Sequence, residues 1–253
     1  MGGDGDLQSS ALNLRNLREY SRPMRTLCII PARGGSKRIP RKNIKNFLGK
    51  PIIAYSIAAA QESGLFDEIM VSTDDDEIAE VARAYGAKVP FTRSAQASSD
   101  TATTLQALSE VINQYKERGS QPTAVCCIYP AAPFVTCDLL QEAYDLLTTQ
   151  DFDCVFPVLR YGFPVQRSMT VDGNRRVSLR YPEYQATRSQ DLEPTYHDAG
   201  MFYWFRPFPV LQAGSLWTSN TGCVEVVELA AQDIDTPADW QVAEFKFRHR
   251  QHG

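Results

Sequence analysis

Short apolar runs alternate along this chain with segments whose apolar residues recur at helical spacing. The runs "LCIIP" (27–31), "EIMVST" (68–73) and "AVCCIYP" (124–130) are apolar at successive positions, which favours strands buried on both faces. The segments that follow them carry apolar stripes three or four residues apart, over 51–64, 75–86, 104–119 and 138–147. This alternation predicts an α/β fold, a doubly wound and mostly parallel sheet of the Rossmann-like three-layer type.

The pattern changes in two places. Residues 1–25 are rich in Gly, Asp and Ser and precede the first strand, so we expect an extension outside the core. Residues 157–196 are polar and turn-rich, with strand-like pieces and no helical stripe, and they predict a small β-rich insertion. Strands resume after it, and Thr236 and Pro237 are typical of the N-cap and first residue of a last helix. We therefore expect one domain over residues 26–253 that carries an insertion.

Composition excludes some classes of partner. A formal net charge of -4 gives no overall field that would hold nucleic acid or an anionic membrane. The six cysteines lack the spacing of metal ligands and most lie in apolar runs, which predicts reduced thiols in the cytoplasm. The most helix-like apolar segment, "PIIAYSIAAA", is too short to span a bilayer, and the N-terminus lacks a signal-peptide pattern. We expect no passage through a membrane.

The stretch "IIPARGGSKRIPRKN" (29–43) places five cationic residues directly after the first strand. Ligands of open parallel sheets bind beyond the carboxyl ends of the strands. Gly34 and Gly35 would let backbone N–H groups approach phosphate oxygens, and Arg33 and Lys42 would supply charged donors. Neither the Walker pattern nor GxGxxG is present. The stretch predicts a nucleoside triphosphate site, with a solvated basic loop as the alternative.

Two carboxylates near the C-terminus suggest a metal. Asp233 and Asp235 lie two residues apart, so in an extended backbone both would face one side while Ile234 points to the core. Hard oxygen ligands suit Mg²⁺. The alternative is that Asp235 and Thr236 cap the last helix.

Two other acidic positions are typical of helix starts. Thr73 or Asp74 before Glu77 predicts an N-cap. Asp100 is either the N-cap of the next helix or a ligand contact.

The stretch 29–43 resembles the signature of the cytidylyltransferases that activate nonulosonic acids, the family of CMP-sialic acid synthetase. The similarity continues through "VSTDDDEIAEVARAYGAKVPFTRSAQASSDTATT", "YPAAPF" and "DIDTPAD", and so covers most of the chain from about Thr26. It implies a nucleotide-diphospho-sugar transferase-like fold and a homodimer formed through the insertion. It also implies transfer of CMP from CTP to a nine-carbon sugar acid, with release of pyrophosphate.

Within this family, "TRSQDLEPTYHDAGMFYW" is similar to the pseudaminic acid enzymes, whereas the sialic acid enzymes have Asn-Gly where this chain has Ala199 and Gly200. Two features depart from that subgroup: Met201 replaces Gln, and "FRPF" (205–208) stands where Trp-Gly usually continues. We expect both near the sugar pocket. Sialic or legionaminic acid is therefore an alternative substrate, and a CTP-binding module without turnover is the alternative from another class.

The resemblance implies a role for individual residues. Arg33 and Lys42 would bind the triphosphate, and Asp233 and Asp235 would hold the Mg²⁺ that bridges the phosphates. The other CTP contacts would be Gly34, Gly35, Ser36, Asn43, Arg93, Ala102 and Thr104. The sugar acid would meet Tyr129, Arg188, His197, Asp198 and Phe202. For His197, hydrogen-bonded structural support is the alternative to a substrate contact.

Overall fold

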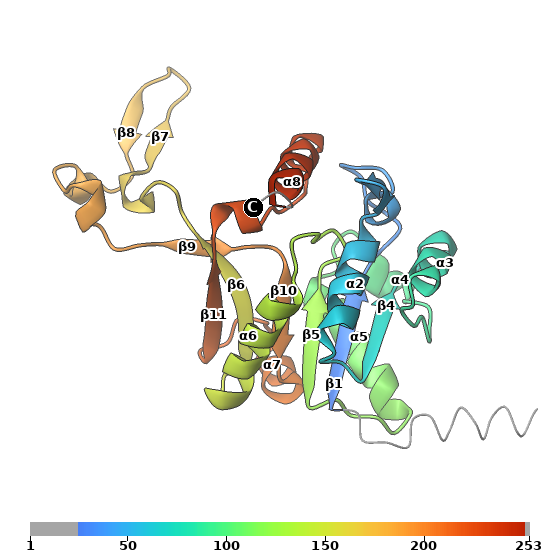
Figure 1. Ribbon diagram of the computed structural model, residues 1–253. Helices are drawn as coiled ribbons and strands as arrows, with labels where there is room; N and C mark the ends of the chain where they lie inside the picture. Colours follow the sequence, from blue (N-terminus) through green and yellow to red (C-terminus); the bar gives the residue numbers. More distant parts are fainter. Residues whose placement is uncertain (1–24, 251–253) are drawn as a thin grey trace, which may run out of the picture.

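The computed structural model describes residues 25–250, so the predicted extension, except its last residue Arg25, lies outside the described residues. A seven-stranded sheet forms the centre, in the order β11-β6-β10-β5-β1-β4 with β9 paired to β6 (Figure 1). Its strands are β1 (Thr26–Pro31), β4 (Glu68–Ser72), β5 (Ala124–Ile128), β6 (Cys154–Arg160), β9 (Tyr196–Asp198), β10 (Phe202–Phe205) and β11 (Thr221–Val226). The hairpin β2 (Asn46–Phe47) and β3 (Lys50–Pro51) lies outside it.

The predicted fold class is confirmed. Strand β1 pairs in parallel with β4 and β5, and β11 pairs in parallel with β6. Strands β9 and β10 are antiparallel to β6, and β10 is also antiparallel to β5. Between β9 and β10 the chain kinks at Gly200, whose φ of 65° suits a residue without Cβ.

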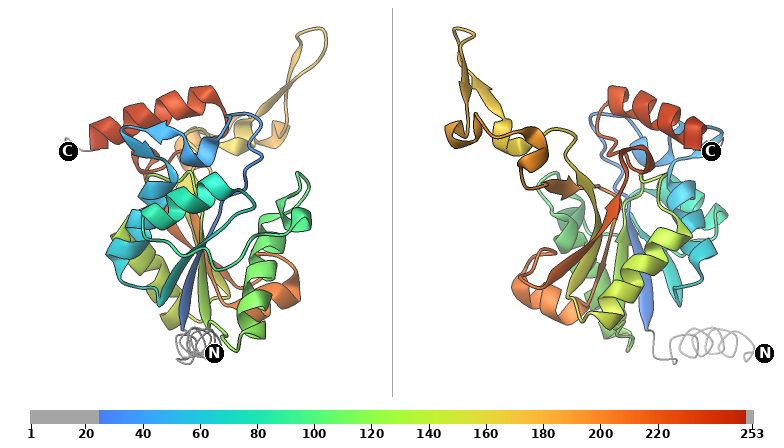
Figure 2. Two further views of the ribbon diagram at one scale, coloured as in Figure 1. Left: turned by 90° about the vertical axis from the view of Figure 1, so that its right-hand side faces the viewer. Right: turned by 60° about the vertical axis from the view of Figure 1, so that its left-hand side comes forward.

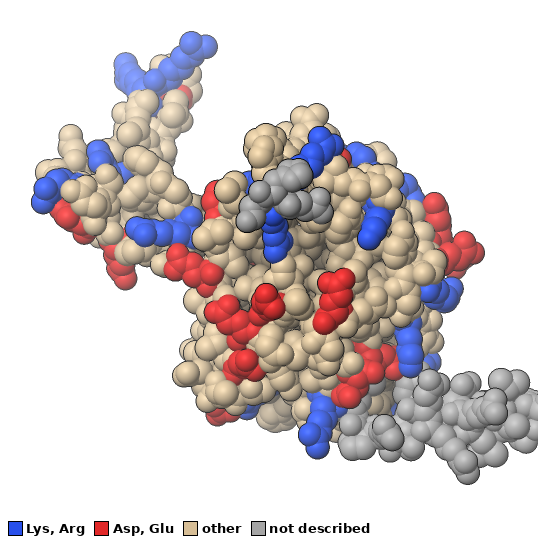
Figure 3. Space-filling view, in the orientation of Figure 1, with Lys and Arg blue, Asp and Glu red and all other residues tan. Residues whose placement is uncertain are grey.

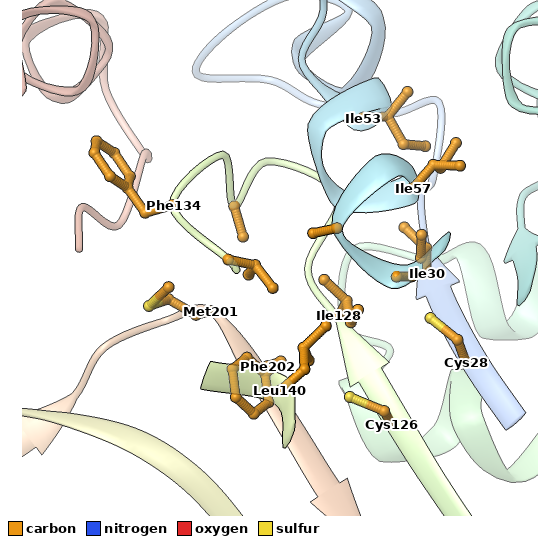
Figure 4. Close-up of a cluster of buried hydrophobic side chains, with 14 of the residues drawn as sticks. Cys28, Ile30, Ile53, Ile57, Cys126, Ile128, Phe134, Leu140, Met201 and Phe202 are labelled. Atoms are coloured by element: carbon orange, nitrogen blue, oxygen red, sulfur yellow. The ribbon is translucent and has the colours of Figure 1, made fainter. Parts of the chain in front are cut away.

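Helices cover both faces of the sheet. Helices α2 (Ile53–Ser63), α3 (Asp76–Ala84), α6 (Cys137–Thr149) and α8 (Pro237–Arg250) contribute to one buried cluster, and α5 (Thr104–Glu117) and α7 (Pro207–Ala213) to another. The short helix α4 (Ala95–Ser98) precedes α5. Strand β1 alternates between the clusters: Cys28 and Ile30 belong to the first (Figure 4), Leu27 and Ile29 to the second. Successive apolar residues thus serve two cores, as expected for a covered strand.

Local capping fixes the helix starts, and only one of the predicted caps is found. Thr236 accepts the N–H of Asp239 at 3.3 Å, which confirms it as the cap of α8. Helix α3 is capped by Asp75, which accepts the N–H of Ile78 at 3.0 Å, and not by Thr73 or Asp74. The N-cap of helix α5 is Thr103, which forms a capping box with Gln106, so Asp100 is not the cap of this helix. The chain turns at Ser99 and Asp100 before the helix begins.

Residues 161–195 leave the sheet and form a protrusion with the hairpin β7 (Met169–Val171) and β8 (Val177–Leu179) (Figure 2). Strand β6 continues to Arg160 because it pairs with β11 as far as Leu159 and Val226, so this segment departs later than the expected residue 157. The exposed Arg175 and Arg176 lie in the turn at its tip, where basic side chains gather (Figure 3).

Candidate active site

A cavity of about 610 Å³ opens beyond the carboxyl end of β1. The loop after β1, the segment after β5, the kink between β9 and β10, and the segment before α8 supply its walls. Its lining residues are Pro31, Arg33, Ser36, Lys37, Arg38, Lys42, Asn43, Asp100, Tyr129, Pro130, Ala131, Gly200, Asp233, Ile234 and Asp235. Pockets for small molecules usually measure about 300–1,000 Å³. This cavity lies where the sequence predicts the nucleotide site, at the carboxyl end of β1.

The cations of the loop face two groups of acceptors across the cavity. On one side, Arg33 donates to the carbonyl oxygen of Ser99 at 2.9 Å, and both Arg33 and Lys37 form ion pairs with Asp100. This pairing lowers the pKa of Asp100, chiefly through Lys37. Asp100 therefore forms ion pairs with cations of the loop instead of capping a helix.

On the other side, Arg38 and Lys42 face the Asp233–Asp235 segment. The guanidinium of Arg38 lies 2.9 Å from the Asp235 carboxylate, and the Lys42 ammonium lies 3.5 Å from it. Lys42 also donates to the carbonyl oxygen of Ile234 at 2.7 Å. The loop and the carboxylate pair, almost two hundred residues apart in the sequence, thus form one site.

Charge counting indicates what this cavity suits. Four cations line it (Arg33, Lys37, Arg38, Lys42) against three carboxylates (Asp100, Asp233, Asp235), which gives 4 − 3 = +1. A divalent cation on the carboxylates would raise this to about +3, close to balancing a triphosphate of about four negative charges. The cavity therefore suits a polyanion that brings a metal ion with it.

The carboxylate pair has the predicted arrangement. Ile234 is only 1% exposed and packs in the core, while the side chains on either side of it line the cavity. Partial burial raises the pKa of Asp233, and the nearby Asp235 raises it further. The carboxylate of Asp239, instead of that of Asp235, accepts the Thr236 N–H at 2.7 Å, so the alternative in which Asp235 caps α8 is wrong.

This donor set fits Mg²⁺. Within residues 25–250, no group of three or more His, Cys, Asp or Glu side chains is placed to hold a metal. Mg²⁺ is commonly bound through one or two carboxylates, with water and substrate phosphates as its other ligands. Asp233 and Asp235 meet that requirement because both open into a cavity wide enough for a triphosphate.

A smaller cavity of about 220 Å³ adjoins the first and shares Pro31, Arg33 and Tyr129 with it. The residues predicted to recognise cytosine and ribose, Arg93, Ala102 and Thr104, all line it. Arg93 is only 6% exposed, and Ser72 accepts two of its N–H groups, at 2.9 Å through the hydroxyl and 2.8 Å through the carbonyl. Burial lowers the pKa of Arg93. Its fixed guanidinium keeps further donors for a ligand.

The glycines of the loop differ in what surrounds them. Gly34 donates its N–H to Asp74 at 2.9 Å, and a Cβ on Gly34 would lie 2.7 Å from a carboxylate oxygen of Asp75. Gly35 has open space where a Cβ would stand. Gly34 is thus required by its packing against the start of α3, a reason that the sequence did not indicate. The predicted contacts of both glycines with phosphate remain predictions.

Ser36 and Asn43 both line the cavity. The Asn43 side chain is buried and donates to the carbonyl oxygen of Arg33 at 2.9 Å, which closes the loop on itself. Asn43 thus fixes the backbone that carries Arg33, in addition to any contact with the nucleoside.

The predicted sugar-binding residues separate into two groups. Tyr129 lines both cavities, and its pKa is raised by burial. Asp198 lies beside the site: it accepts the N–H of Gly200 at 2.8 Å and the hydroxyl of Tyr203, and thereby holds the kink that contacts Asp233. Burial raises the pKa of Asp198.

Arg188, His197 and Phe202, like Asp198, do not line the cavity. Phe202 is fully buried in the core (Figure 4) because β10 is covered on both faces. His197 lies on β9 with its ring against Tyr161, and Arg188 pairs with Asp191 in the protrusion at 3.0 Å. The strand pattern predicted β10 but not how deeply both of its faces are covered.

Neither departure from the pseudaminic acid subgroup lines the cavity, although Met201 directly follows Gly200, which does. Met201 is 1% exposed and packs in the core (Figure 4). The "FRPF" segment spans the end of β10 and the start of α7. Because β10 is antiparallel, its last residue lies at the sheet edge opposite the cavity. Lys37 and Arg38 were not named as site residues from the sequence, although both line the cavity. The only signal for them in the sequence was the concentration of positive charge in the stretch 29–43.

Comparison with known proteins agrees with this geometry. The family model for cytidylyltransferases matches residues 27–209. A pseudaminic acid cytidylyltransferase of Campylobacter jejuni (strain 81-176) is 40% identical over 225 residues, which cover 89% of this chain and 97% of the relative. A CMP-N,N'-diacetyllegionaminic acid synthase of Legionella pneumophila is 33% identical over 231 residues, covering 87% and 95%.

Among solved structures, a CMP:2-keto-3-deoxy-manno-octonic acid synthetase complexed with CTP superposes with a TM-score of 0.65. It shares 17% identity and covers 89% of this chain and 99% of its own, so it shows the fold. In residues 25–250, no helix is both long and apolar enough to cross a membrane. The family match and the relatives confirm the resemblance: the chain is a nucleotidyltransferase enzyme that belongs to the cytidylyltransferase family.

Proposed function

We propose that the enzyme transfers CMP from CTP to pseudaminic acid and releases pyrophosphate. The observation that carries the reaction is that four loop cations line one cavity together with Asp233 and Asp235, next to a smaller cavity lined by the fixed Arg93 guanidinium. The relative at 40% identity, named for pseudaminic acid, supports the choice of sugar acid. The legionaminic acid relative at 33% supplies the second candidate.

The residues of the chain would bind and orient the two substrates. Arg33, Lys37, Arg38 and Lys42 would move from their present carboxylate partners to the phosphate oxygens, and Arg93 would face the nucleoside. The anomeric hydroxyl of the sugar acid would attack the α-phosphorus, forming a new P–O bond as the bond to pyrophosphate breaks. In such transfers positioning and charge neutralisation carry most of the catalysis.

Asp233 and Asp235 would hold Mg²⁺, which would supply positive charge that neutralises phosphate charge. Lys42 would keep the segment in place through its bond to the carbonyl oxygen of Ile234, a contact that does not use its ion pair with Asp235. The fold therefore fixes the carboxylates independently of the metal.

A panel of sugar acids in a pyrophosphate-release assay tests the proposal. With CTP and Mg²⁺, pseudaminic acid is expected to give the highest kcat/KM. Turnover with legionaminic or sialic acid but not with pseudaminic acid would overturn the choice of substrate. Binding of CTP without turnover on any acid would instead favour a module that only binds the nucleotide.

We also propose a homodimer formed through the protrusion and a cytoplasmic location. Met169, Val171 and Val177 of the hairpin are each more than half exposed, which is unusual for apolar side chains unless a partner covers them. Light scattering that gives the mass of one chain at micromolar concentration would reject the dimer.

All six cysteines are free thiols, which supports the proposed location in a reducing compartment.

A further inference from the structure

Arg41, the fifth cation of the loop, is absent from the lining of the cavity. Its guanidinium donates to both carboxylate oxygens of Asp75, one bond measuring 2.9 Å, and also to Glu77. Asp75 is itself fixed as the N-cap of α3, where it accepts the N–H of Ile78 at 3.0 Å. A bidentate pair of this kind is geometrically specific. The guanidinium is therefore already engaged by the start of α3.

The backbone of Arg41 adopts a conformation that a non-glycine residue rarely takes. Its φ is 55°, in the left-handed region, and its carbonyl oxygen accepts the N–H groups of Ile44 and Lys45 at 3.0 Å each. The short 3-10 helix that begins at the next residue places Lys42 and Asn43 in the cavity. A left-handed arginine persists only where its surroundings hold it. The ion pairs to α3 supply that restraint.

The same acidic segment also contacts the other end of the loop. Asp74 accepts the N–H of Gly34, and a Cβ on Gly34 would lie only 2.7 Å from a carboxylate oxygen of Asp75. Residues 74–77 thus hold the loop 33–43 near both of its ends. The side chains of Arg41 and Asp75 are 39% and 22% exposed, so water screens the pair only partly.

We propose that Arg41 is a positioning residue: its ion pairs with Asp75 and Glu77 hold the loop in the form that binds CTP, and it touches no phosphate itself. This inference rests on the proposed function for the identity of the nucleotide. It gives residues 74–77 a role beyond starting α3.

A double-mutant cycle on CTP binding, measured by calorimetry, tests this role. Arg41→Ala and Asp75→Asn are each expected to weaken CTP binding about fivefold, which corresponds to about 1 kcal/mol and is the range of a partly exposed ion pair. Asn keeps the cap of α3. Both changes break the same ion pair between Arg41 and Asp75. The double variant should therefore bind CTP with about the same affinity as the single variant that binds it more weakly. Arg176→Ala, in the exposed hairpin turn, is the control for loss of a cation and should bind like the parent.

The opposite role predicts different results. If Arg41 bound phosphate, Asp75→Asn would release it and CTP would bind as well or better, and the losses in Arg41→Ala would not depend on Asp75. That outcome would overturn the inference. Arg33→Ala combined with Asp75→Asn provides the comparison for a loop cation outside this bridge, since the Arg33 guanidinium pairs with Asp100.

Hydrogen exchange without nucleotide separates this inference from the proposed function. The Ile44 and Lys45 amides should exchange at least several-fold faster in Arg41→Ala than in the parent, because both bond to the Arg41 carbonyl oxygen. Unchanged exchange together with unchanged affinity would overturn the inference. A parent enzyme that binds no CTP would contradict the proposed function, while the exchange rates would still show whether Arg41 holds the loop.

Discussion

Two acidic segments flank the cationic loop, and the protein uses them in opposite ways. The oxygens of Asp74, Asp75 and Glu77 accept hydrogen bonds from Gly34, Arg41 and the first turn of α3. Asp233 and Asp235 instead open into the cavity, where Asp235 meets Arg38 and Lys42 at its rim. Proximity to the loop therefore does not identify a metal-binding carboxylate. Asp233 and Asp235 are the proposed metal ligands because their side chains line the cavity.

In each segment one carboxyl group has a shifted pKa, and the two shifts have opposite directions and different causes. The pKa of Asp75 is lowered, chiefly by its hydrogen bond with Arg41, so its charge is stabilised by the protein itself. Burial, followed by the charge of Asp235, raises the pKa of Asp233. Asp75 is thus paired within the fold, whereas the Asp233 carboxylate is partly buried beside a second carboxylate.

Replacing the open carboxylates should have the largest effect. Asp233→Asn and Asp235→Asn are each expected to reduce kcat by about 100-fold or more, since loss of a charge contact made in the transition state costs about 2.7 kcal/mol or more. Thermal stability without Mg²⁺ should be equal or higher, because two neighbouring carboxylates no longer repel each other. Pyrophosphate release and thermal melts measure the two effects, and added Mg²⁺ should recover part of the rate.

Asp74→Asn is the matched control in the other segment. Asn retains the oxygen that accepts the Gly34 N–H, so the rate should remain within about threefold of the parent. A loss comparable with that of Asp233→Asn would contradict the distinction between the segments. Parental rates in both Asp233→Asn and Asp235→Asn at limiting Mg²⁺ would remove the pair from the active site.

The two glycines of the loop test the contact with α3 at the next level of effect. In Gly34→Ala the new methyl would lie 2.7 Å from the Asp75 carboxylate, so the loop must shift, and we expect KM for CTP to rise about tenfold. Gly35→Ala meets open space and should leave thermal stability unchanged. If Gly34→Ala keeps the parental KM, Asp75 does not fix the loop. A rise of KM in Gly35→Ala alone would place a phosphate at Gly35.

Much of this organisation follows from the sequence because it depends on local patterns. Successive apolar residues predicted β1 and β5, and the spacing of Asp233 and Asp235 around Ile234 predicted which side chains reach the cavity. Other features depend on contacts between distant segments. The division of labour between Arg41 and Arg38 is set by which carboxylate each one meets, Asp75 or Asp235, and no spacing rule indicates that.

The predicted sugar-binding residues also show that local sequence patterns do not indicate contacts between distant segments. Alternation along "FYWF" indicates a strand but not that both of its faces are covered, so it did not indicate that Phe202, predicted to contact the sugar acid, is fully buried in the core. Arg188 and His197 follow from similarity in sequence, yet the protrusion carries Arg188 away from the cavity and β9 turns His197 toward Tyr161. Their distance from the cavity is a property of the whole fold.

Asp100 is an intermediate case between the two acidic segments, because it lines the cavity but is already paired with Lys37 and Arg33. In Asp100→Asn these cations lose a competitor for phosphate, so KM for CTP should fall by up to about fivefold, the range of exposed ion pairs. The effect should shrink at high salt. A higher KM, measured at low and high salt, would mean that Asp100 orders the loop more than it competes with the ligand.

The smallest expected effect is a pH dependence of stability from Asp75. Because its pKa in the folded state is lowered from a usual value of 3.8, the Arg41 pair contributes stability that is fully present above that value. The contribution is lost as the pH falls through the lower folded-state pKa, where the carboxyl group takes up a proton.

Partial exposure of both side chains limits the contribution of the Arg41–Asp75 pair to about 1 kcal/mol. Urea unfolding should therefore show Asp75→Asn less stable than the parent by a constant amount between about pH 5 and pH 8, and the difference should disappear as the pH falls below the folded-state pKa of Asp75. Asp233→Asn should give the reverse sign at neutral pH without Mg²⁺, since the raised pKa of Asp233 means that its charge costs stability there. Equal signs in the two variants would show that both segments are held by the fold in the same way.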